Sequence, residues 1–264
     1  FYLYKKSAYN NQEAQKWWLS KSLINFQKNL NDFNINLELI KTDSFKIFFD
    51  KLLKEKDISV YWNKVYEPDY LKFDEYLLKN LKNKNIPFKI CKGNVLNEIH
   101  EVKKGDGTPF KVFTPFWRNA ERYYIEKIPP KNKIIKRCSK NKNYFQNCID
   151  PKKILPKKSW FKDFEKIWSP SEESGLKELK NFIKDRIINY SDGRNFPSII
   201  GTSKLSPFIK FGQIHVETIW DECMSPKNKK IGTSKFLAEI GWREFNHSLI
   251  NHFPHMLKNN YSKK

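Results

Sequence analysis

A carboxylate, an indole and an amide lie close together on one predicted helix in the last part of the chain. Residues 234–250 have apolar residues at helical spacing, and Glu239, Trp242 and Asn246 follow one another at intervals of three and four. Side chains at these intervals project from one face of a helix. An indole can stack on a nucleobase while a carboxylate and an amide hydrogen-bond its edge, so this face is suited to recognising a base. Arg243 lies one position round, within reach of an anion.

A run of hydroxyl residues precedes a second predicted helix. Residues 201–207 read Gly-Thr-Ser-Lys-Leu-Ser-Pro. Ser206 is a favourable N-cap residue, the fixed φ of Pro207 suits the first helical turn, and Gly212 would end the apolar segment that follows. Free backbone N–H groups at a helix start, beside three hydroxyls, can bind a phosphate or pyrophosphate. An ordinary well-capped helix explains the same residues equally well, so both interpretations stay open.

Three short motifs together resemble the DNA photolyase/cryptochrome family. They are Thr-Ser-x-Leu-Ser-Pro at 202–207, Phe-Gly-x-Ile at 211–214 and Glu-x-x-Trp-Arg-Glu-Phe at 239–245, in the family's order and at similar spacing. The chain most resembles a class I type deoxyribodipyrimidine photolyase, which acts on cyclobutane pyrimidine dimers. The resemblance is weak in the first half of the chain and strong after Trp160.

The resemblance implies two sets of site residues. The first would contact FAD, whose diphosphate the hydroxyl run would wrap: Tyr190, Thr202, Ser203, Lys204, Leu205, Ser206, Phe236 and Arg243. The second would contact damaged DNA: Arg194, Glu239, Trp242, Arg243 and Asn246. Glu239 would hydrogen-bond the damaged pyrimidines and Trp242 would pack on them, which makes these two the catalytic residues. Phe236 stands where relatives often have Trp, so an indole N–H is lost at that position.

The implied activity is light-dependent repair of cyclobutane pyrimidine dimers in DNA. Excited reduced FAD would give an electron to a dimer flipped out of the duplex, and the dimer would split and return the electron. The implied partner is ultraviolet-damaged DNA, and a second, antenna chromophore of folate or deazaflavin type is compatible with the family. Two alternatives remain: a cryptochrome-type blue-light photoreceptor, and a basic nucleic-acid-binding module without cofactor.

Charge favours a polyanionic partner, although composition weakens the inference. The chain has 264 residues, a net charge of +21 and a pI near 9.6, which suits phosphate neutralisation. Only six of the 50 basic residues are Arg, and Lys, Asn and Ile abound throughout, so biased coding DNA is an alternative explanation. The few Arg residues are the better candidates for bidentate contacts. A hydrophobic content of 39% is sufficient for a packed core and argues against global disorder.

Cysteine and hydropathy patterns predict a cytoplasmic protein with no metal site and no membrane partner, and we expect this protein to be a monomer. The four cysteines are scattered without a Cys-x-x-Cys pair, at Cys91, Cys138, Cys148 and Cys223. His252 and His255 are separated by Pro254, which argues against a helical metal pair. No run approaches the length of a transmembrane helix, and no signal-peptide pattern opens the chain.

The order of predicted elements indicates an α/β domain followed by an all-α domain. Helical spacing alternates with β-rich runs, with helices at 12–30, 44–54 and 69–83 and strands at 34–40, 58–62 and 87–91. This alternation implies βαβ units and a parallel sheet. The predicted parts are a Rossmann-like α/β domain at 1–127 without its first strand, a connector at 128–159, and a truncated all-α FAD-binding domain at 160–264.

Smaller features complete the organisation predicted from the sequence. Residues 63–68 are expected to form a strand-end turn stopped by Pro68, and residues 114–118 a packing anchor. Helical spacing returns at 176–188. Because the chain opens on Phe1 and the family's later pocket residues are not found, we interpret it as an internal fragment carrying roughly half of the flavin pocket.

Overall fold

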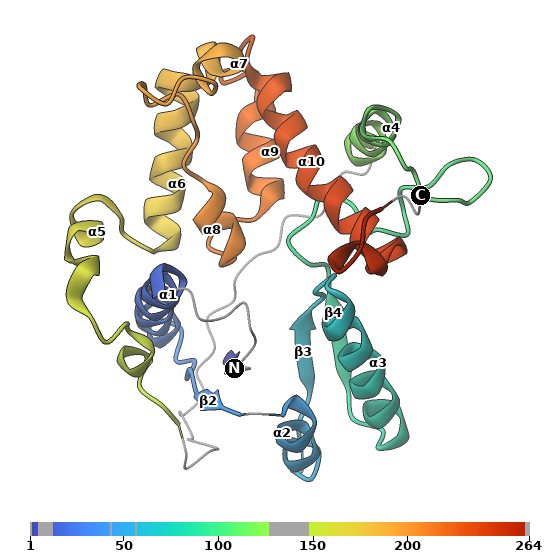
Figure 1. The fold of residues 1–264 in the computed structure, drawn as a ribbon. Coiled ribbons are helices and arrows are strands. Elements are labelled where there is room, and N and C mark those ends of the chain that lie inside the picture. Colours follow the sequence, from blue (N-terminus) through green and yellow to red (C-terminus); the bar gives the residue numbers. More distant parts are fainter. Residues whose placement is uncertain (1, 5–12, 43, 56, 127–147, 262–264) are drawn as a thin grey trace. The chain divides into compact units, whose positions relative to one another are not determined.

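In the computed structural model, which describes residues 2–4, 13–42, 44–55, 57–126 and 148–261, helices predominate and the strands form small parallel sheets (Figure 1). The chain divides into two compact units. The first comprises Phe1–Leu52, Lys131–Glu178 and Lys204–Ile214, and the second Leu53–Pro130, Leu179–Ser203 and His215–Lys264. The combination of a parallel α/β part with a helical part confirms the predicted fold class.

Both sheets of the described residues are two-stranded and parallel, as predicted. In the first unit β1 (Tyr2–Tyr4) pairs with β2 (Leu39–Lys41), with Tyr2 opposite Leu39. In the second unit β3 (Val60–Asn63) pairs with β4 (Phe88–Cys91), with Val60 opposite Phe88. Parallel neighbours need a crossover connection, and a predicted helix lies between the strands of each pair. These helices are α1 (Glu13–Asn31) and α3 (Pro68–Asn83).

Two predicted elements differ most from the observed ones. The alternating residues of 34–40 form a strand only from Leu39, and Asn34 adopts a left-handed φ of 56° in the turn after α1. The helix expected over 176–188 is α6 (Glu172–Asn181), which passes into a π-helical turn (Phe182–Arg186) and a 3₁₀ turn (Ile187–Asn189). Apolar spacing alone does not distinguish these helix types.

In the first unit, helices pack around the indole of Trp18 on α1. Its ring centroid lies 5.0 Å from that of Phe208 and 5.4 Å from that of Trp168, and its Nε1 donates to Gln213 at 2.9 Å. The remaining helical elements of this unit are α2 (Phe45–Leu52), α5 (Lys162–Ile167), α8 (Ser206–Lys210) and the 3₁₀ turns Pro151–Ile154 and Ser159–Phe161.

In the second unit, the long helix α10 (Thr233–His252) is the central element. It packs against α4 (Phe113–Glu126), α7 (Tyr190–Gly193) and α9 (Val216–Met224) (Figure 1). A short 3₁₀ turn, Pro254–Leu257, follows it.

One of the two smaller predictions for this unit is confirmed. Phe116 is buried in a cluster with Phe110 and Phe245, so residues 114–118 do anchor α4 in the core. The turn expected over 63–68 is wrong, because residues 64–66 are irregular and Pro68 is the first residue of α3, where its fixed φ starts a helix.

Part of the predicted connector, residues 128–147 with Cys138, lies outside the described residues. The segment 204–214 belongs to the first unit with α1, and residues 53–130 belong to the second unit with α9 and α10. The division into domains at residues 127 and 160 therefore stays a prediction.

Gly241 brings α10 into close contact with α4. A Cβ atom at Gly241 would lie 2.3 Å from Cε3 of Trp117, a distance at which the two atoms overlap. Glycine is ordinarily unfavourable inside a helix by about 1 kcal/mol relative to alanine. Here it is required because the Trp117 indole occupies the space of its side chain.

We therefore predict that Gly241→Ala destabilises the protein, by about 1–3 kcal/mol, through overpacking against Trp117. Urea unfolding followed by circular dichroism measures the change. Gly105→Ala is the control, because a Cβ there meets nothing within 4 Å. Trp117→Leu should partly rescue Gly241→Ala; a stabilising effect of Gly241→Ala alone would contradict the close packing.

Candidate functional site

The solvent-facing side of α10 carries the three residues predicted to read a base. Trp242 is 43% exposed, Asn246 is exposed and Glu239 is half-buried. Their spacing on a continuous helix places them on a common face, as expected. Asn246 lies one turn beyond Trp242 on this face.

The indole of Trp242 stacks on an aromatic ring of α4. Its centroid lies 3.8 Å from that of Phe113 with an interplanar angle of 8°, while Phe245 meets it edge-on at 6.0 Å. Phe113 covers one face of the indole, and the exposed fraction of Trp242 leaves surface for a second planar group. The arrangement is therefore a preformed stacking platform.

Glu239 and Arg194, from α10 and the end of α7, form an ion pair. The Lys235 ammonium lies 3.8 Å from the same carboxylate oxygen, and the Arg194 guanidinium lies 5.6 Å from the ring centroid of Tyr190. The hydrogen bond to Glu239 is the main cause that raises the pKa of Arg194. Two predicted DNA-contacting residues are thus paired with each other.

Tyr190 and Phe236, both predicted to contact FAD, lie side by side in the core of the second unit. Their ring centroids are 5.3 Å apart, and Phe182 packs on both at 5.5 Å and 4.6 Å. Burial raises the pKa of the Tyr190 phenol, against the opposing charge of Arg194. The structure therefore brings these two predicted residues together and next to the Arg194–Glu239 pair.

The loop between α7 and the hydroxyl run brings Gly201 into close backbone contact with Gly193. A Cβ at Gly201 would lie 2.1 Å from the carbonyl oxygen of Gly193, so only glycine fits there. Thr202 and Ser206 are exposed and Leu205 is buried. Thr202 and Ser203 belong to the second unit, while Lys204, Leu205 and Ser206 belong to the first.

The predicted N-cap role of Ser206 is wrong. Ser206 is the first residue of α8, Leu205 occupies the cap position, and no side chain caps this helix. Lys204 has a φ of 56°, so the chain turns two residues before Ser206. The predicted end of the segment at Gly212, with a φ of 70°, is confirmed.

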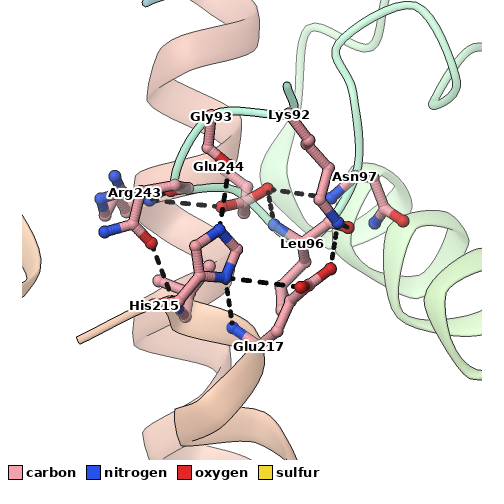
Figure 2. Close-up of polar contacts among 10 residues, drawn as sticks. Lys92, Gly93, Leu96, Asn97, His215, Glu217, Arg243 and Glu244 are labelled. Atoms are coloured by element: carbon pink, nitrogen blue, oxygen red, sulfur yellow. Dashed lines mark hydrogen bonds and ion pairs between the residues drawn. The ribbon is translucent and has the colours of Figure 1, made fainter. Parts of the chain in front are cut away.

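Arg243 lies beside Glu244 and the loop after β4 (Figure 2). Its Nη1 donates to the carbonyl oxygen of Asn94 at 2.5 Å and lies 3.4 Å from Oε1 of Glu244. The loop after β4 is thus its partner in the described structure.

Glu244 anchors α10 to the same loop and was missed as a site residue. Its Oε2 accepts hydrogen bonds from the backbone N–H groups of Leu96 at 3.0 Å and Asn97 at 3.4 Å (Figure 2). The Trp-Arg-Glu motif contains this residue, but no sequence signal pointed to its partners 148 and 147 positions away.

A second set of polar contacts ties the start of α9 to this loop (Figure 2). His215 Nε2 lies 3.1 Å from the carbonyl oxygen of Gly93, and its Nδ1 accepts from the backbone N–H of Glu217 at 3.2 Å. The tautomer that satisfies both contacts carries its proton on Nε2. Glu217 in turn forms an ion pair with Lys92.

Burial shifts two titratable groups of α10 in opposite directions. It raises the pKa of Glu244 to about 8, against the charge of Arg243 and the two backbone hydrogen bonds. It lowers the pKa of His247, which packs on Tyr66, to about 4, and the charge of Arg243 adds to this effect. Both side chains are therefore largely uncharged near neutral pH.

The described residues contain no group of three or more His, Cys, Asp and Glu side chains that could hold a metal ion. Over the same ranges, no helix is both long and apolar enough to cross a membrane.

Comparison with known proteins places this geometry in a family. The family model described as DNA photolyase matches residues 1–133, half of the chain. The chain belongs to the DNA photolyase family. This confirms the family inferred from the motifs of the second half.

Individual relatives agree with this membership. A deoxyribodipyrimidine photo-lyase of Agrobacterium fabrum is 31% identical over 99% of this chain and 55% of its own length. Cryptochrome-2 of Arabidopsis thaliana is 26% identical over 91% of this chain and 42% of its own. The crystal structure of a class III photolyase from Agrobacterium tumefaciens is 31% identical, with a TM-score of 0.86, and the match covers 99% of this chain and 55% of that one. The chain thus spans about half the length of these photolyases.

We predict opposite pH responses for variants of the two shifted groups of α10. Because the pKa of the Glu244 carboxyl is raised, its contribution to folding stability is complete below pH 4.5 and is lost as the pH rises through 8. Because the pKa of the His247 imidazole is lowered, its contribution is complete above pH 6.5 and is lost as the pH falls through 4. The free energy of unfolding should be nearly level between pH 5 and 6.5, and fall by about 1 kcal/mol between pH 6.5 and 8.

The free energy of unfolding of Glu244→Gln should instead rise by about 1.5 kcal/mol between pH 5 and 6.5 and then stay level. That of His247→Phe should fall by about 3.5 kcal/mol from pH 5 to 8. Urea unfolding at four pH values provides the measurement. Parallel profiles of all three proteins would contradict the assignment of the shifts to these residues.

Proposed function

We propose that this chain is part of a deoxyribodipyrimidine photo-lyase, which repairs cyclobutane pyrimidine dimers in DNA in a light-dependent reaction. The observation that carries the proposal is the exposed face of α10, where a supported indole and a carboxylate lie beside an arginine. Family membership supports the same conclusion. We also propose that the protein is a cytoplasmic monomer with ultraviolet-damaged DNA as its partner.

The proposed roles follow from the chemistry of each side chain. A damaged pair of bases must leave the helical stack to be reached, and it does so at lower cost than an intact pair. Trp242, supported by Phe113, would stack on the extruded bases, an interaction worth about 1–3 kcal/mol per base. Glu239 would accept a hydrogen bond from a ring N–H, while Arg194 would bind a neighbouring phosphate. Asn246 would extend the same polar edge.

The residues present fit FAD, which the family resemblance implies as the cofactor. In the sequence, Thr202 and Ser206 lie two residues before and two residues after Lys204, and both are exposed. Hydroxyl and ammonium groups have the chemistry to bind a diphosphate. Ser203 and Leu205 belong to the same run, and Tyr190 and Phe236 would form the apolar part. When bound, FAD supplies light-driven electron transfer. The assignments of Arg243 to FAD and of a second, antenna chromophore stay predictions.

A cryptochrome-type photoreceptor is the second candidate function, favoured by the similarity to the Arabidopsis protein. A photoreceptor that signals through its flavin has no need of a base-reading face, so Glu239 and Trp242 favour repair. A basic module without cofactor would bind any DNA in a salt-dependent manner and would not prefer damaged sites.

The repair proposal predicts that Trp242→Ala lowers affinity for dimer-containing DNA about tenfold or more, because one stacking surface is lost. Fluorescence anisotropy with matched oligonucleotides, one carrying a single thymine dimer and one intact, measures the preference. Trp160→Ala is the control, since Trp160 is similarly exposed at 40% but lies in the first unit. Equal loss for both variants, or an unchanged preference in Trp242→Ala, would contradict the stacking role.

The cofactor proposal predicts that Lys204→Gly weakens FAD binding about tenfold or more, through loss of a charge-assisted contact. Glycine tolerates the left-handed φ of this residue, so the free energy of unfolding should change by less than about 1 kcal/mol. The blue absorption retained after reconstitution and gel filtration reports the bound FAD. Lys210→Ala, an exposed lysine of α8, should retain FAD normally; equal retention by Lys204→Gly would exclude the proposed contact.

A further inference from the structure

We propose that the Arg194–Glu239 ion pair determines specificity by withholding both groups from undamaged DNA. The pair would open only when a DNA phosphate takes Arg194 and an extruded base takes Glu239. This inference rests on the proposed function, since it assigns the two groups to DNA.

The geometry of the pair supports such an exchange. Arg194 follows α7 and Glu239 lies on α10, so the pair joins two separate elements of the second unit. The side chains are 29% and 28% exposed, so part of each is within reach of solvent, while the Nη1 atom of Arg194 that meets Glu239 is itself covered. A carboxylate bound to a guanidinium competes for the same N–H groups that a phosphate oxygen would use.

The surroundings of each partner reduce the cost of opening. The Arg194 guanidinium rests over the ring of Tyr190, a contact that does not depend on Glu239. Lys235, one turn before Glu239, lies 3.8 Å from its carboxylate and would keep a positive charge beside it. Each member therefore retains a second favourable contact when the other leaves.

Intact DNA and dimer-containing DNA differ in the contacts that can replace the broken Arg194–Glu239 ion pair. Intact duplex supplies a phosphate for Arg194, but its stacked bases keep their ring N–H groups in base pairs, away from Glu239. An extruded dimer supplies both a phosphate and a free base edge. The ion pair thus weakens binding to intact DNA in particular. This selectivity is important because a chain with a net charge of +21 attracts any duplex.

A double-mutant cycle on intact duplex DNA tests this directly. Glu239→Gln should tighten binding to intact duplex about threefold to tenfold, because Arg194 is released for a phosphate. The dependence of log K on log salt should steepen by about 0.9, the value for one additional phosphate contact. In the Arg194→Ala background, Glu239→Gln should change neither the affinity nor the slope by a comparable amount.

Asp192→Asn is the matched control, since it removes the same charge from an exposed residue two positions from Arg194. The small effect of Asp192→Asn on the affinity for duplex DNA should be the same whether residue 194 is Arg or Ala. If Glu239→Gln tightens binding equally in both backgrounds, its effect is general electrostatics and the proposal is overturned. Failure of both wild type and Glu239→Gln to bind duplex overturns it as well.

Two further readouts separate this proposal from the repair function. Without DNA, the cycle should show coupling between Arg194 and Glu239 in urea unfolding, and an absence of coupling would overturn the pairing itself. With dimer-containing DNA, Glu239→Gln should reduce the preference for damage. If wild type shows no such preference, the proposed repair function fails, while the intact-duplex cycle still decides the role of the pair.

Discussion

The anchoring of α10 through the buried carboxyl of Glu244 is the constraint on which the candidate site depends. An uncompensated polar group in the interior costs several kcal/mol, so the two backbone N–H groups of residues 96 and 97 must stay in place around it. Arg243 binds the carbonyl oxygen of Asn94 in the same loop. The rotation of α10 about its axis is thereby set, and with it the direction in which Glu239 and Trp242 point.

Aromatic packing on α4 completes this constraint. Gly241 allows the Trp117 indole to approach the backbone of α10, and one residue later Phe113 stacks on Trp242. Residues that face the core and residues that face solvent therefore follow one another closely along this part of α10. The segment 239–245 thus combines residues that fix α10 in the core with the residues proposed to contact DNA.

The distribution of arginine follows the same physical logic. The chain carries its charge mostly on lysine, and Lys92 and Lys235 contact carboxylates at the site, but Arg194 and Arg243 also make contacts there. A planar guanidinium makes directed hydrogen bonds to a carboxylate or carbonyl at lower hydration cost than an ammonium group. These two arginines occupy defined positions, Arg194 against the carboxylate of Glu239 and Arg243 against the carbonyl oxygen of Asn94.

The sequence by itself determined the elements and the family: helical spacing identified α1, α3 and α10, the βαβ order predicted parallel strands, and the motifs at 202–207 and 239–245 predicted a photolyase. Local periodicity and motif spacing are properties of neighbouring residues, which is why they could be read directly. Only the tertiary structure decided that Arg243 turns to Asn94, that Glu244 binds the backbone at Leu96 and Asn97, and that Arg194 pairs with Glu239. These contacts join residues up to 149 positions apart and depend on burial and charge in three dimensions, for which a linear pattern has no signal.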